Sequence, residues 1–229
     1  MIQNIRLFGL ALLLSVGIGS VGNAASFDCD KATTETEIAI CSDPELSALD
    51  ELLADKYMLL EGSGKYDELA KRHHRSWEKT ERTADVYSLQ KQLDNLRLFS
   101  IVSDCQSVEG NTFANCNLAA DQHVQTCIGL ENFTTNAMNR CGLSQVSVYE
   151  EILTLEVEEW VERLSGDPQT QQLFLASQAK WRDFVKADCD WQWSEFRDGT
   201  IRGQIYAGCM IGHLTARLLR ITASNWSEQ

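Results

Sequence analysis

The sequence has few of the features that mark β-structure. Runs of alternating β-branched and aromatic residues are almost absent, and only two of the 229 residues are proline. Pro44 and Pro168 each stand where a helix would begin, a position at which the missing backbone N–H is harmless. We therefore predict an all-α fold.

Motifs of common catalytic and nucleotide-binding sites are also missing. The chain has no G-x-S-x-G, no H-E-x-x-H and no glycine-rich phosphate loop. His74 and Glu78 have the spacing of an acid–base pair, but this spacing more often gives a solvated contact on a helix. Carboxylates crowd the segment 150–162 and could cleave sugars, although a solvated helix face is the commoner use. We predict no catalytic residue and no cofactor, and hence a protein that is not an enzyme.

Long hydrophobic runs are missing except at the N-terminus. Arg6 precedes an apolar run from Leu7 to Val16, and small residues follow as far as Ala24. This is the layout of a cleaved secretory signal, and the run is short for a membrane span, which needs about 20 residues. We predict that residues 1–24 are a signal peptide, that the protein is periplasmic or secreted, and that it does not insert stably into a membrane.

Positive charge is scarce. The chain has 20 basic and 33 acidic residues. Removing Arg6 with the signal leaves 19 against 33, a net charge of −14. Such a chain repels nucleic acid and favours basic partners. We expect a protein partner and no nucleic acid.

Close C-x-x-C pairs and cysteine–histidine clusters are absent, which argues against a metal site. Eight cysteines are nevertheless present: Cys29, Cys41, Cys105, Cys116, Cys127, Cys141, Cys189 and Cys209. An even number of cysteines in an exported chain indicates a disulfide framework. We predict that all eight form disulfides, so that none serves as a catalytic thiol.

Apolar spacing predicts the helices. Three- and four-residue steps indicate helices over 44–60, 146–164, 168–185 and 201–221, and one long helical pattern over 65–102 whose polar middle can bend. A single turn over 35–40 would be capped by Thr33 or Thr34 and held by a disulfide. Another short turn, capped by Thr134 or Thr135, ends at Cys141. The stretch "DCQSVEGNTFANCNLAADQ" (104–122) is expected to be a loop or short turn.

The spacing of tryptophan and cysteine suggests an internal duplication. Trp77 and Cys105 are 28 positions apart, as are Trp181 and Cys209. Fixed spacing of this kind is typical of repeated units. We therefore predict two related helical units, residues 25–118 and 119–229, in one disulfide-stapled bundle.

The duplication also suggests how the cysteines pair. Antiparallel helices joined at "DGT" would bring Cys189 next to Cys209. The place equivalent to Cys189 in the first half is Asp85, so Cys105 needs another partner, and Cys116 is near. The predicted pairs are Cys29–Cys41, Cys105–Cys116, Cys127–Cys141 and Cys189–Cys209. Each closes a short loop and would stabilise the fold by about 3 kcal/mol in the chain-entropy model.

Two segments carry a family resemblance. The segment "SFDCDKATTETEIAICSDPELSALDELLADKY" resembles the opening of the lysozyme inhibitor LprI-like N-terminal domain family, at Cys29, Thr34, Glu37, Cys41, Leu46, Leu49, Asp50, Leu53 and Tyr57. The segments "SQAKWRDFVKADC" and "DGTIRGQIYAGCMIGHLTARLLRI" resemble its later part, at Gln178, Trp181, Cys189, Gly199, Thr200, Cys209, Thr215 and Leu218. The resemblance implies an exported helical module, and a founding member of the family inhibits lysozyme.

Two kinds of binding protein are thus open, with an enzyme that acts on cell-wall sugars or peptides as a third alternative. The first is a lysozyme inhibitor that occupies the lysozyme cleft, with a basic lysozyme as partner. The second is an envelope interaction or structural module without inhibitory activity, including an immunity protein against a wall-degrading toxin. Trp77, Trp160 and Trp181 are expected in the core. Trp191 and Trp193 point in different directions on a helix, so one of them is expected to be exposed and could anchor a partner or pack on the Cys189–Cys209 bridge. The binding residues are otherwise not predicted.

Overall fold

The computed structural model describes residues 25–59, 66–80, 85–109 and 111–223. The predicted signal peptide, residues 1–24, lies outside the described residues. Eight α-helices and no strand are present in the described part, which confirms the all-α prediction. The helices are α1 (Glu35–Ser42), α2 (Pro44–Leu59), α3 (Asp67–Thr80), α4 (Val86–Ser107), α5 (Phe113–Leu130), α6 (Thr135–Arg163), α7 (Pro168–Glu195) and α8 (Arg202–Thr222). Two short 3-10 turns, Cys29–Lys31 and Leu164–Gly166, precede α1 and α7.

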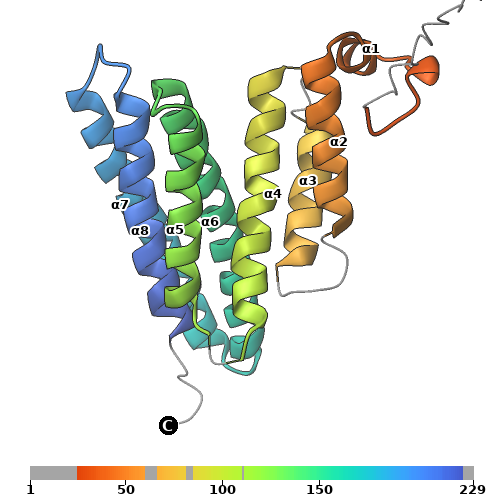
Figure 1. Ribbon diagram of the computed structural model, residues 1–229. Helices are drawn as coiled ribbons and strands as arrows, with labels where there is room; N and C mark the ends of the chain where they lie inside the picture. Colours follow the sequence, from red (N-terminus) through yellow and green to blue (C-terminus); the bar gives the residue numbers. More distant parts are fainter. Residues whose placement is uncertain (1–24, 60–65, 81–84, 110, 224–229) are drawn as a thin grey trace, which may run out of the picture.

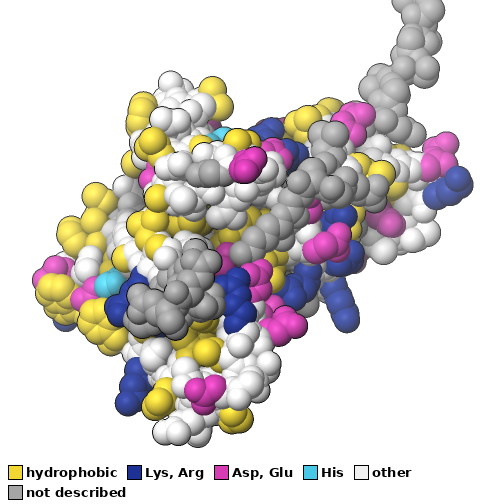
Figure 2. Space-filling view, turned by 90° about the horizontal axis from the view of Figure 1, so that it is seen from below, with side chains coloured by type: hydrophobic (Ala, Val, Ile, Leu, Met, Phe, Trp, Pro, Cys, Tyr) yellow, Lys and Arg dark blue, Asp and Glu magenta, His cyan; other side chains and the backbone are white. Residues whose placement is uncertain are grey.

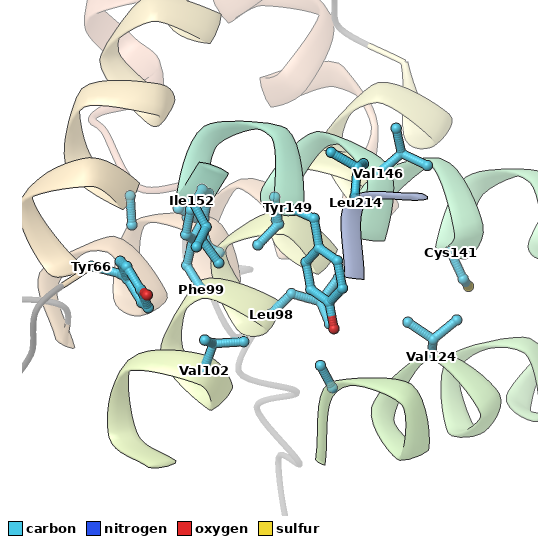
Figure 3. Close-up of a cluster of buried hydrophobic side chains, with 14 of the residues drawn as sticks. Tyr66, Leu98, Phe99, Val102, Val124, Cys141, Val146, Tyr149, Ile152 and Leu214 are labelled. Carbon is cyan, nitrogen blue, oxygen red and sulfur yellow. The ribbon is translucent and has the colours of Figure 1, made fainter. Parts of the chain in front are cut away.

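The helices run side by side, with α4 near the middle of the molecule (Figure 1). On one side α4 packs against α2 and α3, and on the other against α5 and α6. α8 packs mainly against α6 and α7, and α7 forms the edge of the molecule opposite to α2. Figure 3 shows side chains from both halves of the chain meeting in one core, among them Phe99, Tyr149, Ile152 and Leu214.

The N-terminal region shows how local sequence sets the first helices. The Thr34 hydroxyl accepts the Glu37 backbone N–H, and the Glu37 carboxylate accepts the Thr34 N–H, so a capping box starts α1. α1 ends at Ser42, and the Asp43 carboxylate accepts the Glu45 N–H at 2.8 Å at the start of α2. Pro44 cannot donate a backbone hydrogen bond to α1, so the chain starts α2 as a separate helix.

Three predictions about helices were wrong. The long pattern over 65–102 is two helices, α3 and α4, and the Asp85 carboxylate caps α4 by accepting the Ser88 N–H at 2.9 Å. The expected loop 104–122 contains most of the first three turns of α5. After Phe113, the buried face of α5 is built from the smaller side chains Cys116, Ala120, Val124 and Cys127. Polar residues between them hid this spacing.

The third wrong prediction concerns the turn that was expected to end at Cys141. Thr134 caps a helix by accepting the Ala137 N–H at 3.2 Å, but this helix, α6, runs without a break for 29 residues. No proline lies between Cys141 and Pro168, and Gly142 packs close to α8, next to the Ala207 side chain. The expected unit boundary, residue 118, falls inside α5.

Four disulfides join Cys29 to Cys41, Cys105 to Cys116, Cys127 to Cys141, and Cys189 to Cys209. These are the pairs expected from the spacing. Every bridge links residues 11 to 20 positions apart. The bridges therefore staple neighbouring segments, and non-covalent packing holds the two halves together. Among the described helices, none combines the length and the apolar character needed to cross a membrane.

Candidate protein-binding surface

Helix α7 is covered on one side only. It packs along α8, and of its 28 residues only Gln178, Val185 and Cys189 are buried. The other sides of the helix face solvent along most of its length. A helix in this position at the edge of the molecule can present side chains to a partner.

Large apolar side chains gather near the C-terminal end of α7 and in the turn to α8. We call residues 183–201 the hairpin tip. Its exposed large apolar residues are Phe184, Trp191, Trp193, Phe196 and Ile201. Figure 2 shows hydrophobic side chains, with acidic and histidine side chains among them, at the edge of the molecule where Figure 1 places α7. Large exposed apolar side chains gathered in one segment are typical of interaction sites in soluble proteins.

The two tryptophans of the hairpin tip differ in their surroundings. The Trp193 ring packs edge-on against Tyr206, and the Arg202 guanidinium lies 4.7 Å from its centroid. Trp191 is 58% exposed, and no described aromatic ring or guanidinium packs on its indole. Both tryptophans are exposed, Trp191 at 58% and Trp193 at 37%, so Trp191 is the more exposed of the two.

Acidic residues surround the apolar side chains of the hairpin tip. The tip contains five acidic residues, Asp183, Asp188, Asp190, Glu195 and Asp198, and two basic ones, Lys186 and Arg197. Its net charge is therefore −3. Lys186 pairs with Asp190, and this hydrogen bond raises the pKa of the Lys186 ammonium. The tip can therefore attract a basic protein surface.

The hairpin tip is held in place by contacts with α8. The Cys189–Cys209 bridge ties α7 to α8, and His213 lies 2.9 Å from the Asp188 carboxylate. Phe184 packs edge-on against the His213 ring, with centroids 5.4 Å apart. A braced surface loses little conformational entropy when a partner binds.

A cleft of about 480 Å³ opens beside the hairpin tip, between α6, α7 and α8. Trp181, Tyr206 and Met210 supply apolar walls, and Glu150 and Arg182 supply charges of both signs. Burial raises the pKa of Glu150. The cleft is large enough to accept a partner's side chain next to the tip.

The carboxylates of α6 make different contacts. Glu150 and Glu151 line the cleft, but they are consecutive residues of one helix and point in different directions. A hydrogen bond with His73 lowers the pKa of Glu151. Glu156 is buried and accepts the Tyr66 hydroxyl at 2.8 Å, and Glu159 pairs with Arg163 on the surface. The acidic residues thus serve separate contacts.

Two other sequence expectations need correction. His74 was expected on a solvated face, but it is buried, and its Nδ1 lies 3.2 Å from the Gln92 amide nitrogen. The Glu78 side chain lies outside the described residues. Trp77, Trp160 and Trp181 are only partly buried, at the margin of the core. Their rings are too large to be covered completely by the neighbouring helices.

One comparison with known proteins gives a match. Residues 130–220 match the model of the family described as lysozyme inhibitor LprI. No curated protein and no solved structure shows a significant match to the chain. The matched segment spans α6, α7 and nearly all of α8, and it includes the whole hairpin tip. The resemblance to the LprI family that the sequence predicted is therefore confirmed over residues 130–220.

Proposed function

We propose that the protein is an exported inhibitor of lysozyme that binds its target through the hairpin tip. The family description supports the activity. The four disulfides and the signal-like residues 1–24 support export to a periplasmic or extracellular space. The observation that carries the proposed binding mode is the acidic, aromatic tip inside the family-matched segment.

The proposed mechanism is binding without chemistry. Trp191 and Phe184 supply exposed aromatic area, and aromatic anchors dominate the energetics of protein interfaces. Acidic residues around them attract a lysozyme, a typically basic protein, and increase the association rate at low salt. Filling or covering the lysozyme cleft then blocks access of the cell-wall substrate. In this proposal, no residue of the protein acts as a catalyst.

Lysis of bacterial cell walls by lysozyme tests the proposal. Oxidised protein in micromolar excess at low salt should slow lysis, and about 0.5 M salt should weaken the effect because charges more than a few ångströms apart are then screened. Trp191→Ala should raise the concentration needed for half inhibition by about 30-fold, the lower limit for an interface hot spot. Unchanged lysis with the wild-type protein would contradict inhibition.

A matched variant controls for the loss of any exposed apolar side chain. Met58 on α2 is 61% exposed and lies at the opposite edge of the molecule from α7 (Figure 1). Met58→Ala should inhibit as well as the wild type does. Equal inhibition by Trp191→Ala and the wild type would show that the hairpin tip is not the binding surface, although the protein would still be an inhibitor.

The second candidate is a non-inhibitory envelope module, including an immunity protein against a wall-degrading toxin. The family match leaves residues 25–129 uncovered, and these carry helices α1 to α5. A partner that binds residues 25–129 would be captured from an envelope extract by the wild-type protein, with no change in lysozyme activity. N-terminal sequencing of the protein from its host tests export for both candidates, and the expected first residue is Ala25 or Ser26.

A further inference from the structure

Next to the Cys189–Cys209 bridge, four side chains with metal-binding atoms converge. Asp188 and Cys189 come from α7, and Cys209 and His213 come from α8, where their spacing of four puts them on one face. One ligand atom from each residue lies within 4.8 Å of the other three. The Asp188 carboxylate oxygen is 2.9 Å from His213 Nε2 and 3.7 Å from Cys209 Sγ.

We propose that the dithiol form of the Cys189–Cys209 pair binds one zinc ion together with His213 and Asp188, so that the bridge and the metal site are alternative states of the same four residues. Two thiolates, an imidazole and a carboxylate are a ligand set that zinc accepts in tetrahedral geometry. Zinc–ligand bonds of about 2.0–2.3 Å put the ligands of such a site about 3.3–3.8 Å apart. The Asp188–His213 and Asp188–Cys209 distances lie within about 0.4 Å of this range, and the two sulfurs, 2.00 Å apart in the bridge, must move about 1.3–1.8 Å apart once the bridge is reduced.

A second cluster, in which a carboxylate also lies beside a disulfide, already contains a positively charged side chain. Asp94 lies beside the Cys127–Cys141 bridge, and the Arg140 guanidinium occupies the space between them. Arg140 Nε donates to Asp94 at 2.9 Å, and Nη2 lies 3.6 Å from Cys127 Sγ and 3.8 Å from Cys141 Sγ. This built-in cation excludes a metal ion from the second cluster. The Asp188 cluster contains His213 in place of an arginine.

Access also favours the Asp188 cluster. The Asp188 and His213 side chains are 29% and 25% exposed, so an ion can reach them from solvent. Asp94 and Arg140 are 7% and 5% exposed. Sequence reasoning missed the site because it looked for close cysteine pairs, whereas these ligands come from two helices. The signal that was present is the four-residue spacing of Cys209 and His213.

The bridge must be reduced before zinc can bind. A dithiol reductant gives two electrons to the bridge, the S–S bond breaks, both sulfurs take up a proton, and the dithiol becomes a disulfide. Zinc then replaces the two thiol protons and forms two Zn–S bonds, and two protons pass to solvent. His213 contributes the Nε2 lone pair with its proton on Nδ1, and Asp188 contributes a carboxylate oxygen.

Cobalt(II) is a coloured probe for such a site. The full chain is reduced under native conditions, mass mapping identifies the open bridges, and the protein is titrated with cobalt and then zinc. One cobalt ion per chain should bind with thiolate charge-transfer absorption, and zinc should displace it. The oxidised protein should bind no cobalt and should show no thiolate absorption. His213→Ala should weaken zinc binding at least 10-fold, as expected for the loss of a ligand, whereas Met58→Ala, at an exposed residue of α2, should leave it unchanged.

A second variant avoids reduction. Cys189→Ala opens only this bridge and leaves Cys209, His213 and Asp188 as three ligands, so cobalt should still give thiolate absorption, with lower affinity. The proposal is overturned if Cys189→Ala and the reduced wild type bind no cobalt, or if His213→Ala binds zinc as tightly as the wild type. Lysozyme inhibition plays no part in this test.

Discussion

Two disulfides of similar loop length, Cys29–Cys41 and Cys127–Cys141, each tie the first turns of a helix to the segment before it. Each of the two helices starts at a threonine cap, Thr34 in α1 and Thr134 in α6. α1 has 8 residues and stops before Pro44, whereas α6 has 29 and continues past its cysteine. The same starting arrangement thus gives a short turn in one half and the longest helix in the other.

The surroundings of the two bridges differ as well. Cys127 and Cys141 are buried next to the Arg140–Asp94 ion pair, while Cys29 and Cys41 are partly exposed. One proline and one buried charge therefore account for more of the structural difference between the two halves than the cysteine spacing does. The proposed duplication stays a prediction, and the following changes test how different the two arrangements are.

The largest effect is expected from Arg140→Met. Arg140 bonds to Asp94, Glu131 and Gln90, and its removal leaves the Asp94 carboxylate buried without its strongest partner. Breaking a buried pair in this way costs about 3–5 kcal/mol of unfolding free energy. Denaturant unfolding followed by circular dichroism measures it. Arg97→Met, which removes a more exposed charge 3.7 Å from Asp94, should cost less than about 1 kcal/mol.

Removal of each bridge by paired Cys→Ala substitutions should come next. The separations of 12 and 14 residues predict nearly equal losses of about 3 kcal/mol in the chain-entropy model. The buried Cys127–Cys141 pair should cost more than the Cys29–Cys41 pair because its loss also leaves a small cavity. Thermal unfolding of the two double variants measures the difference. A larger loss of stability on removal of Cys29–Cys41 would mean that burial does not decide which bridge stabilises the fold more.

A smaller effect is expected at the two helix caps. Thr34→Ala and Thr134→Ala each remove a hydroxyl that accepts a backbone N–H, which costs about 1 kcal/mol. Hydrogen exchange should show loss of protection spread through α1 but confined to the first turn of α6, because α1 is too short to hold without its cap. Thr→Ser at either position retains the hydroxyl and should behave like the wild type.

The smallest effect is expected from titration of Glu37. Hydrogen bonds from the Thr33 and Thr34 backbone hold the pKa of Glu37 below its ordinary value of 4.5. The folded pKa is therefore lower than the unfolded pKa, so the contribution to stability is present above pH 4.5 and is lost as the pH falls through the folded pKa. An NMR titration of the Glu37 side chain should show this lowered pKa. Thr34→Ala should move it toward 4.5, and an ordinary pKa in the wild type would contradict the capping box.

Much of the fold could be predicted because local signals agreed with the tertiary structure. Pro44 and Pro168 start helices, Thr34 and Thr134 cap them, and cysteine spacing gave the four pairs seen in the structure. Helix α5 was missed because most of its buried face after Phe113 is alanine and cysteine, small side chains with polar residues between them. The length of α6 was missed because the first half suggested a break that only Pro44 causes.

The candidate surface was less predictable than the fold. The sequence placed Trp191 and Trp193 two positions apart, and helix geometry required different environments for them. Which of the two is more exposed depends on Tyr206 and Arg202, and their contacts with Trp193 are set by the hairpin and not by local sequence. The same holds for His213, whose partner Asp188 lies 25 positions away.

The pairing of the cysteines affects the order in which the bridges form as the protein matures. Each cysteine is joined to the next one along the chain, first to second, third to fourth, and so on. A chain that emerges from a ribosome or a translocon N-terminus first would meet every correct partner before any competing one. Sequential oxidation would then produce the native bridges directly, and a disulfide isomerase would have nothing to correct.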